Sequence, residues 1–349
     1  MAISSATYAQ SSFRLAIAQE AAFGSAIGTQ TAFQELDIIT PAQPDMASGV
    51  VEDTRKRADG SRIMAEKDTY RITVGGLYVI PFECIVTQET MDYFLYGVMQ
   101  DWVSTTKVDT KYNNIFEWDN ATTGPDFIAD EGKLFTVIGY DPSQDWMAKS
   151  CILRNVTFSA SPGTNGGRLT ASGEFVTGFD IDLAPATAAD PSSWISPGVG
   201  YYPFQTYSAC TIDAADLVPY SFSLTMSNGA VRVGHDADGN TQTYYMDEFE
   251  LSAEIVAKLD ANTVALDAKY RANPTAGAAD GALIMSWGTV DSIGGLEFVM
   301  NAIYTAPNTR DFGQESGVGV TLSYSGRYTG VTKAITVKQT TIADREWDA

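Results

Sequence analysis

The chain contains the same short sequence matches twice, in the same order, and this repeat constrains the fold more than any other feature. The offset between copies is 153 residues for Leu169-Thr-Ala-Ser-Gly-Glu-Phe against Leu322-Ser-Tyr-Ser-Gly-Arg-Tyr, and 146 for Asn155-Val-Thr-Phe-Ser-Ala against Asn301-Ala-Ile-Tyr-Thr-Ala. An offset of 179 relates three earlier matches: Asp37-Ile-Ile to Asp216-Leu-Val, Ala58-Asp-Gly to Ala237-Asp-Gly, and Tyr70-Arg-Ile to Phe249-Glu-Leu. A repeat unit of this length indicates a duplicated domain rather than a solenoid.

The repeat and the length of 349 residues together predict two domains. We divide the chain into an N-terminal arm (1–34), a first domain (35–180), a Pro-rich linker (181–210), a second domain (211–332) and a C-terminal tail (333–349). The arm is rich in Ala, Ser, Thr and Gln, and the tail is polar. We therefore expect the arm to have little core of its own.

The sequence predicts a mainly β fold, in which each repeat is a β-sandwich with a short flanking helix. Its 30 Gly, 16 Phe and 17 Tyr favour strands and turns. Apolar residues spaced as on one helix face predict a helix within 88–100: Met91, Phe94, Leu95 and Val98. A second helix is expected over 263–272. Ala58-Asp59-Gly60 predicts a hairpin turn, and residues 101–132 a loop-rich insertion.

The chain is strongly acidic, with 22 Lys and Arg against 43 Asp and Glu and a formal net charge of −21. Its longest basic run is Arg55-Lys56-Arg57. This charge argues against a protein that binds nucleic acid by neutralising phosphates. It has two interpretations: solubility, or a surface that must lie near DNA without binding it.

Few residues form a pattern typical of catalysis or metal binding, and we predict no enzyme, no cofactor and no metal. The three cysteines lack metal-ligand spacing and are expected to be free, buried thiols. The single histidine, His235, adjoins a predicted turn. Asp236, Asp238 and Asn240 have the opening spacing of a calcium loop, but Asp247 stands where that loop needs glutamate. The N-terminus does not have the pattern of a signal peptide.

Strict alternation over 248–255 predicts a strand with one apolar face and one acidic face. The apolar residues are Phe249, Leu251, Ala253 and Ile255. The polar residues are Glu248, Glu250, Ser252 and Glu254. The polar face is either the ordinary solvated side of a sandwich or the lining of a channel. The matching strand of the first repeat presents Thr69, Arg71 and Thr73.

The order of arm, long hairpin, helix and closing hairpin resembles the tail tube (major tail) proteins of long-tailed, siphovirus-type bacteriophages, in a duplicated-domain variant. Ala22-Phe-Gly-Ser-Ala and Thr40-Pro-x-x-Pro-Asp also resemble that family. The resemblance implies β-sandwiches whose inner sheets join edge to edge into a closed barrel on assembly. It further implies that three chains form a pseudo-hexameric ring, and that rings stack into the tube through which DNA is ejected.

The same resemblance implies partners and a location. The expected partners are further copies of the chain, the tape-measure protein, and tail terminator or tip proteins. Double-stranded DNA passes without binding, and the subunit does not insert into a membrane. The chain is expected in the host cytoplasm before assembly and in the virion tail afterwards. Independently of the resemblance, the arm, the tail and the 47–68 hairpin are expected to contact neighbouring rings, because these segments are too polar to build a core and the hairpin is long for a surface turn. The candidate tip residues are Arg57, Asp59, Gly60 and Arg62.

Two other classes fit an acidic, aromatic-rich β protein. An outer-membrane β-barrel also has alternating strands, although the lack of a signal-peptide pattern and the polar residues 345–349 disfavour it. A carbohydrate-binding or adhesive β-sandwich would use exposed Trp and Tyr side chains. Solubility without detergent tests the former class, and a glycan array tests the latter.

Overall fold

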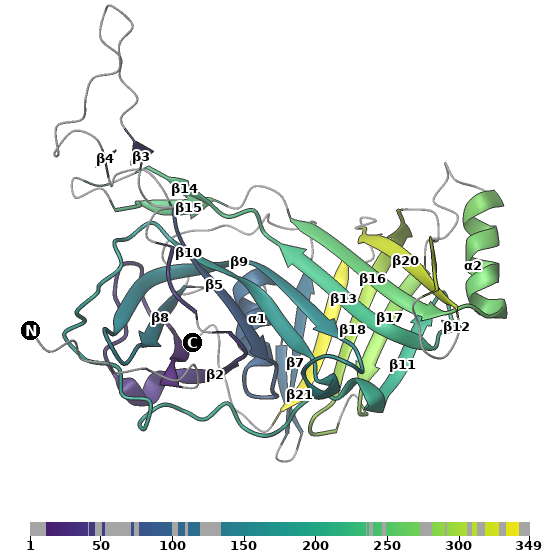
Figure 1. Cartoon of the computed structure of the whole chain (residues 1–349), viewed down its shortest axis with the longest axis horizontal. Helices are drawn as coiled ribbons and strands as arrows, with labels where there is room; N and C mark the ends of the chain where they lie inside the picture. Colours follow the sequence, from purple (N-terminus) through teal and green to yellow (C-terminus); the bar gives the residue numbers. More distant parts are fainter. Residues whose placement is uncertain are drawn as a thin grey trace, which may run out of the picture.

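The fold is mainly β, as the composition predicts (Figure 1). It was obtained as a computed structural model. The structure describes residues 12–40, 42–45, 51–52, 71–72, 77–99, 104–108, 111–118, 134–234, 236, 240–245, 249–272, 281–289, 292–305, 309–312, 318–327 and 333–341.

The strands of the first repeat pair in a closed cycle. The order around the cycle is β1–β2–β5–β10–β9–β8 and back to β1, and every pair is antiparallel. These strands are β1 (Arg14–Gln19), β2 (Gln34–Ile38), β5 (Tyr78–Ile85), β8 (Phe135–Tyr140), β9 (Trp146–Ala160) and β10 (Thr170–Thr177). A separate two-stranded ladder pairs β3 (Val51–Glu52) with β4 (Arg71–Ile72).

The second repeat continues the same sheet, because β13 pairs with the second half of β9. Its strands are β11 (Tyr207–Ile212), β12 (Ala215–Asp216), β13 (Pro219–Ser227), β16 (Glu250–Lys258), β17 (Gly281–Trp287), β18 (Leu296–Tyr304), β19 (Thr309–Asp311) and β20 (Gly319–Gly326). A hairpin of β14 (Val231–Val233) and β15 (Thr243–Tyr245) lies between β13 and β16.

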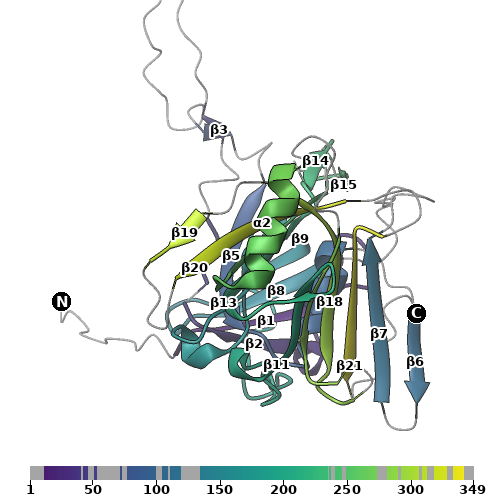
Figure 2. The ribbon, with the colours of Figure 1, turned by 90° about the vertical axis from the view of Figure 1, so that its right-hand side faces the viewer.

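Two strand layers enclose the core (Figure 2). The front layer has the order β5–β10–β9–β13–β16–β20–β19. The back layer has the order β11–β17–β18–β21–β7–β6. It includes β6 (Ser104–Val108), β7 (Lys111–Trp118) and β21 (Ile335–Thr341). A single cluster of buried apolar side chains spans both repeats; Phe158 of β9, for example, lies 5.6 Å from Phe298 of β18 between ring centroids.

Both expected helices are present. The first, α1 (Met91–Met99), has every residue buried and contacts β9, β7 and β13. The second, α2 (Ala261–Ala272), begins after Asp260, whose carboxylate accepts the N–H groups of Asn262 and Thr263. Each helix follows the strand that pairs with the last strand of its repeat, β5 with β10 and β16 with β20.

Two of the sequence matches occupy equivalent places in the strand ladders. Gly173 of β10 lies opposite Val156 of β9, and Gly326 of β20 lies opposite Ala302 of β18. These pairs are the ones that the offsets of 153 and 146 predict. At Gly173 an added Cβ would lie 2.2 Å from the backbone oxygen of Asn155, so this position excludes a side chain, and at Gly326 it would lie 2.2 Å from Leu251 Cδ2. The division into two domains stays a prediction, since the sheet and core are continuous.

Two expectations for the ends of the chain are wrong. The arm was expected to lack a core, but β1 is one strand of the cycle, between β2 and β8, and its Leu15 and Ile17 are fully buried. The tail was expected to be a polar extension, but β21 lies between β18 and β7 with Ile335 and Val337 fully buried. The predicted loop-rich insertion at 101–132 contains the hairpin β6–β7, which completes the back layer over α1.

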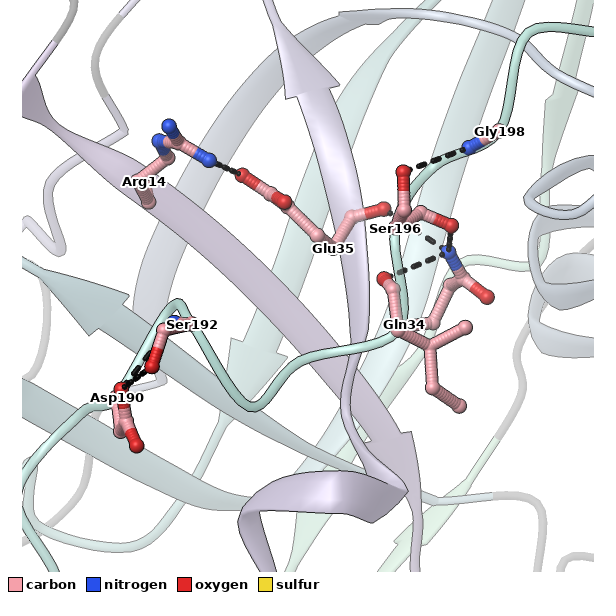
Figure 3. A network of polar contacts seen from close by, with 8 residues as sticks. Arg14, Gln34, Glu35, Asp190, Ser192, Ser196 and Gly198 are labelled. Carbon is pink, nitrogen blue, oxygen red and sulfur yellow. Dashed lines mark hydrogen bonds and ion pairs between the residues drawn. The ribbon is translucent and has the colours of Figure 1, made fainter.

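Part of the predicted linker, 181–210, runs beside β2 (Figure 3). The Gln34 amide nitrogen donates to the carbonyl oxygens of Ile195 (3.2 Å) and Ser196 (2.9 Å). Glu35 donates its backbone N–H to Ile195 and forms an ion pair with Arg14 of β1. The segment also forms its own turn, where Asp190 accepts hydrogen bonds from Ser192. These contacts fix the linker on the first repeat.

Glu20 is a buried carboxylate that ties the start of the chain to β8 and β9. Its Oε1 accepts hydrogen bonds from Thr136 Oγ1 (2.7 Å) and the Ser150 N–H (2.7 Å), and its Oε2 accepts from Ser150 Oγ (2.9 Å). Ser150 has a φ of 48°, which marks an irregularity in β9. Burial raises the pKa of Glu20 above 4.5, although these hydrogen bonds oppose the shift.

Glu20→Gln is expected to flatten the pH dependence of stability. Since the folded pKa lies above the unfolded value of 4.5, the folded state binds the proton more tightly. Stability therefore falls as pH rises from about 4.5 through the folded pKa, and stays reduced above it. Thermal melts between about pH 4.5 and 7 should show a smaller decline for the variant than for the wild type. Glu297→Gln is the control; an equal flattening there would contradict this role for Glu20.

Candidate functional site

The front layer has one continuous polar face across six strands. Along β13, the residues Ser221, Ser223, Thr225 and Ser227 alternate with buried apolar side chains. On β16, Glu250, Ser252 and Glu254 are exposed and alternate with buried Leu251, Ala253 and Ile255. Because side chains of paired antiparallel residues project from the same face, the strand registers align these polar residues in rows.

Three rows cross the sheet roughly perpendicular to the strands. The first is Glu83–Ser172–Thr157–Thr225–Ser252–Ser325. The second is Pro81–Glu174–Asn155–Ser227–Glu250, and the third is Ile85–Thr170–Ser159–Ser223–Glu254–Ser323. We call these three rows the polar face. It is made mainly of hydroxyl groups and carboxylates.

Neighbouring hydroxyls on the polar face hydrogen-bond to one another across the strands. Thr157 Oγ1 lies 2.9 Å from Thr225 Oγ1, which joins the two repeats, and Ser159 Oγ lies 2.9 Å from Thr170 Oγ1. Such bonds hold the side chains along the sheet. The resulting surface offers short, neutral groups to whatever passes over it.

The ionic groups of the polar face are predominantly acidic. The carboxylates are Glu83, Glu174, Glu250 and Glu254. Arg154, which lies at the irregularity between β9 and β10, forms an ion pair with Glu174. Lys258 is exposed at the end of β16 and continues the alternation of Glu250 and Glu254. Arg154 is thus already paired with a carboxylate of the polar face.

The structure brings three of the predicted channel-lining residues together: Glu250, Ser252 and Glu254 are adjacent and exposed on β16. Glu248, Thr69 and Thr73 lie outside the described residues, as do the hairpin-tip candidates Arg57, Asp59, Gly60 and Arg62. Arg71 lies on β4, which pairs only with β3 among the described strands and is not part of the polar face.

The predicted match between residues 70–72 and β16 is not the structural one. β16 pairs with β20 as β5 pairs with β10, so the counterpart of β16 is β5. With the matched residues Ser172 and Ser325 as the reference, Ser252 corresponds to Glu83, since Glu83 lies opposite Ser172 and Ser252 lies opposite Ser325. Pro81 and Glu83 therefore stand where β16 has Glu250 and Ser252. Local sequence similarity placed the counterpart of β16 at residues 70–72, whereas strand pairing places it further along the chain, at β5.

Most residues of the polar face were not predicted from the sequence. The run from Ser221 to Ser227 has the same alternation that identified β16, and that signal was available. Glu83 and Glu174 could not be assigned in this way. Their faces depend on which strands are paired and on the irregularity at Glu174.

The chemically reactive residues form no catalytic arrangement among the described residues. Cys84, Cys151 and Cys210 are free and buried, as predicted, and burial raises the pKa of the Cys210 thiol to about 12. Asp236 accepts hydrogen bonds from the backbone and side chain of Asn240, which closes a turn. No group of three potential metal ligands was found in the described part of the chain. His235 lies outside it.

Residues 11–326 match the family described as phage tail tube protein. The chain belongs to this family. The match covers the arm strand β1 and all three rows of the polar face. It confirms the family that the sequence resembles. The comparison with curated proteins found no match.

Membership of the phage tail tube family makes the chain a structural protein of the virion tail. The family role implies that copies of the chain assemble with one another into a tube. In the described residues, no helix is long and apolar enough to span a membrane. The family match favours the tail tube interpretation over the membrane and carbohydrate-binding alternatives.

Proposed function

We propose that three copies of this chain close into a pseudo-hexameric ring, and that the rings stack into the tail tube of a long-tailed phage. Double-stranded DNA then passes along the lumen during ejection, over the polar face. Tape-measure and terminator or tip proteins are the further partners in this proposal. The single observation that carries it is the polar face, which continues across the junction between the two repeats.

The junction inside the chain supplies a template for the junction between chains. β13 pairs with the second half of β9, from Asn155 opposite Ser227 to Ala160 opposite Phe222. Both strands also keep their partners within their own repeats, β10 for β9 and β16 for β13. One repeat is thus joined to the next by edge-to-edge strand pairing, which satisfies the backbone groups of both edges.

The outer ends of the front layer have the two edges that this junction would need. β18 and then β19 pair along β20, in the way that β9 pairs along β10. Among the described strands, β19 pairs only with β20, so its other edge is open to a partner. At the other end, Asp37 and Ile38 pair with β5, as β13 pairs with β16. We propose that the β18–β19 edge of one chain pairs with the 37–38 edge of the next.

A closed ring of three chains would contain six such junctions, three within chains and three between them. Head-to-tail contacts of this kind close into a ring when the rotation at each junction allows it. The strands would then surround the axis, with the polar face on one side of the wall and the apolar core on the other. Placing the hydroxyls and carboxylates inward gives DNA a wall that does not hold phosphates.

Electron microscopy of the purified chain, combined with native mass spectrometry, tests this proposal. The expected images show hollow tubes or rings with apparent sixfold symmetry, and the expected mass of a released ring is three times the 37.6 kDa of the chain. A ring of six chains would contradict the threefold arrangement. A strictly monomeric chain at high concentration would contradict the assembly itself.

A further inference from the structure

The hairpin β14–β15 has an exposed apolar face that no described residue covers. Val231 pairs with Tyr245, and Val233 pairs with Thr243, so Val231, Val233 and Tyr245 project from the same side. Their exposed fractions are 42%, 43% and 57%. Large apolar side chains grouped on the surface typically mark a contact with another molecule.

The opposite face of this hairpin is fixed to the first repeat. Tyr244 is buried, and its hydroxyl donates to the carbonyl oxygen of Ser150 (2.7 Å) and accepts from the N–H of Gly178 (2.9 Å). Its ring lies 6.0 Å from the ring of Phe23 in an edge-on arrangement. The hairpin is therefore anchored through one face while its other apolar face stays exposed, which indicates a preformed docking surface.

A second exposed apolar surface consists of Val199 and Ile293, on two loops beside Gln88. Val199 is 86% exposed and Ile293 is 48% exposed. They are neighbours of Gly200 and Gly294, and a Cβ on these glycines would lie 2.6 Å and 2.5 Å from the Gln88 side chain. Gln88 also donates its N–H to Gly200 (2.9 Å). Val199 and Ile293 therefore lie on loops that meet at one place.

The two apolar surfaces lie at opposite ends of the strands. The row Pro81–Glu174–Asn155–Ser227–Glu250 adjoins the end from which the β14–β15 hairpin leaves, and the row from Ile85 to Ser323 adjoins the end that leads to Gln88. Figures 1 and 2 both show the hairpin above the sheets, and in Figure 1 the end of β17 points the other way, toward the bottom of the sheets. In a ring whose strands surround the axis, these ends face the neighbouring rings.

We propose that the Val231–Val233–Tyr245 face docks on the Val199–Ile293 pair of a second copy of this chain in the adjacent ring. This inference rests on the proposed function, since it assumes rings that stack. The two surfaces differ and lie at opposite ends of the strands. Two docked rings therefore still have a free hairpin face at one end and a free Val199–Ile293 pair at the other. Such a contact repeats without limit and builds a filament.

The double variant Val231→Glu/Val233→Glu tests the hairpin side. It should form rings of wild-type mass, because the hairpin is away from the edges proposed to close the ring. Buried carboxylates without partners strongly oppose docking. The pelletable tube fraction should fall at least about tenfold, which corresponds to a change of about 1.4 kcal/mol. Val199→Glu/Ile293→Glu should give the same result from the other end.

Val264→Glu is the control, since Val264 is 48% exposed on α2 and belongs to neither of the two apolar surfaces. It should keep the wild-type tube fraction. Equal loss of tubes in this control, or normal tubes in the hairpin variant, would overturn the inference. If the wild type itself forms no rings, the proposed function fails. If all chains form rings and the hairpin variant still stacks, only this inference fails.

Cysteine cross-linking identifies the two partner surfaces directly. Tyr245→Cys and Val199→Cys are prepared separately, mixed as rings and oxidised; the three native thiols are buried. The inference expects chain dimers in the mixture, and far fewer in either variant alone. Equal dimer yields from the separate variants, or none from the mixture, would contradict the pairing of these surfaces.

Discussion

A chain that ends at residue 332 is expected not to fold. Its missing strand, β21, is paired on both sides, with β18 from Leu296 to Met300 and with β7 from Tyr112 to Trp118. Ile335 and Val337 are fully buried, and each such side chain contributes about 1.5–3 kcal/mol. Removing β21 also separates the β6–β7 hairpin from the sheet and uncovers α1. These losses together approach the whole stability of a typical domain, about 5–15 kcal/mol.

Solubility and a thermal melt followed by circular dichroism measure this effect. A chain that ends at Thr341 is the control, because it keeps β21 and removes only residues 342–349. It should melt like the full chain. Val337→Asp should resemble the long truncation, and Lys338→Ala should change little, since its ion pair with Glu297 is long (3.9 Å) and partly exposed. A soluble, cooperatively melting chain 1–332 would contradict the structural role of β21.

The failure to predict β21 has a physical cause. Its sequence, Ile335-Thr-Val-Lys-Gln-Thr-Thr341, looks polar, yet Gln339, Thr340 and Thr341 are buried. Partners from distant segments make this possible: the Gln339 amide donates to the Gln88 carbonyl oxygen (2.7 Å), and Thr340 Oγ1 bonds to Asn113 Oδ1 (2.9 Å). Pairing between segments more than 200 residues apart leaves no local signal.

The elements that were predicted correctly have local signals. The periodic spacing of Met91, Phe94, Leu95 and Val98 identified α1, and all four side chains are buried. Alternation identified β16 and its two faces. The repeat matches at 155–160 and 169–175 identified ladders with the same register. The match at 70–72 was wrong because three residues carry little information, and the strand ladder alone fixes the counterpart.

Reversing charge on the polar face is expected to leave assembly intact and to slow genome ejection strongly. The variant is Glu250→Lys/Glu254→Lys, which changes two exposed residues of β16. Exposed charges contribute little to folding stability, so rings and tubes should form. The carboxylates of the wild type repel DNA phosphates over a screening length of about 8 Å at physiological salt. Lysines at these positions would attract the phosphates instead.

The size of the effect follows from the number of cations in the lumen. Each ring of three chains would present six new lysines, and successive rings repeat them along the whole path of the DNA. Every lysine–phosphate contact releases counterions and strengthens with falling salt. We expect ejection from reconstituted particles to slow at least about tenfold at physiological salt, and the defect to shrink as salt is raised.

A control with the same net charge separates lumen charge from total charge. Glu297→Lys/Asp216→Lys changes two carboxylates, one on β18 of the back layer and one on β12, neither of them in the rows of the polar face. It should eject DNA at the wild-type rate. Equal slowing in both variants would assign the effect to overall charge. A reconstruction of the tube with Glu250 and Glu254 on its outer surface would refute the lumen assignment, because residues on that side of the wall cannot contact the passing DNA.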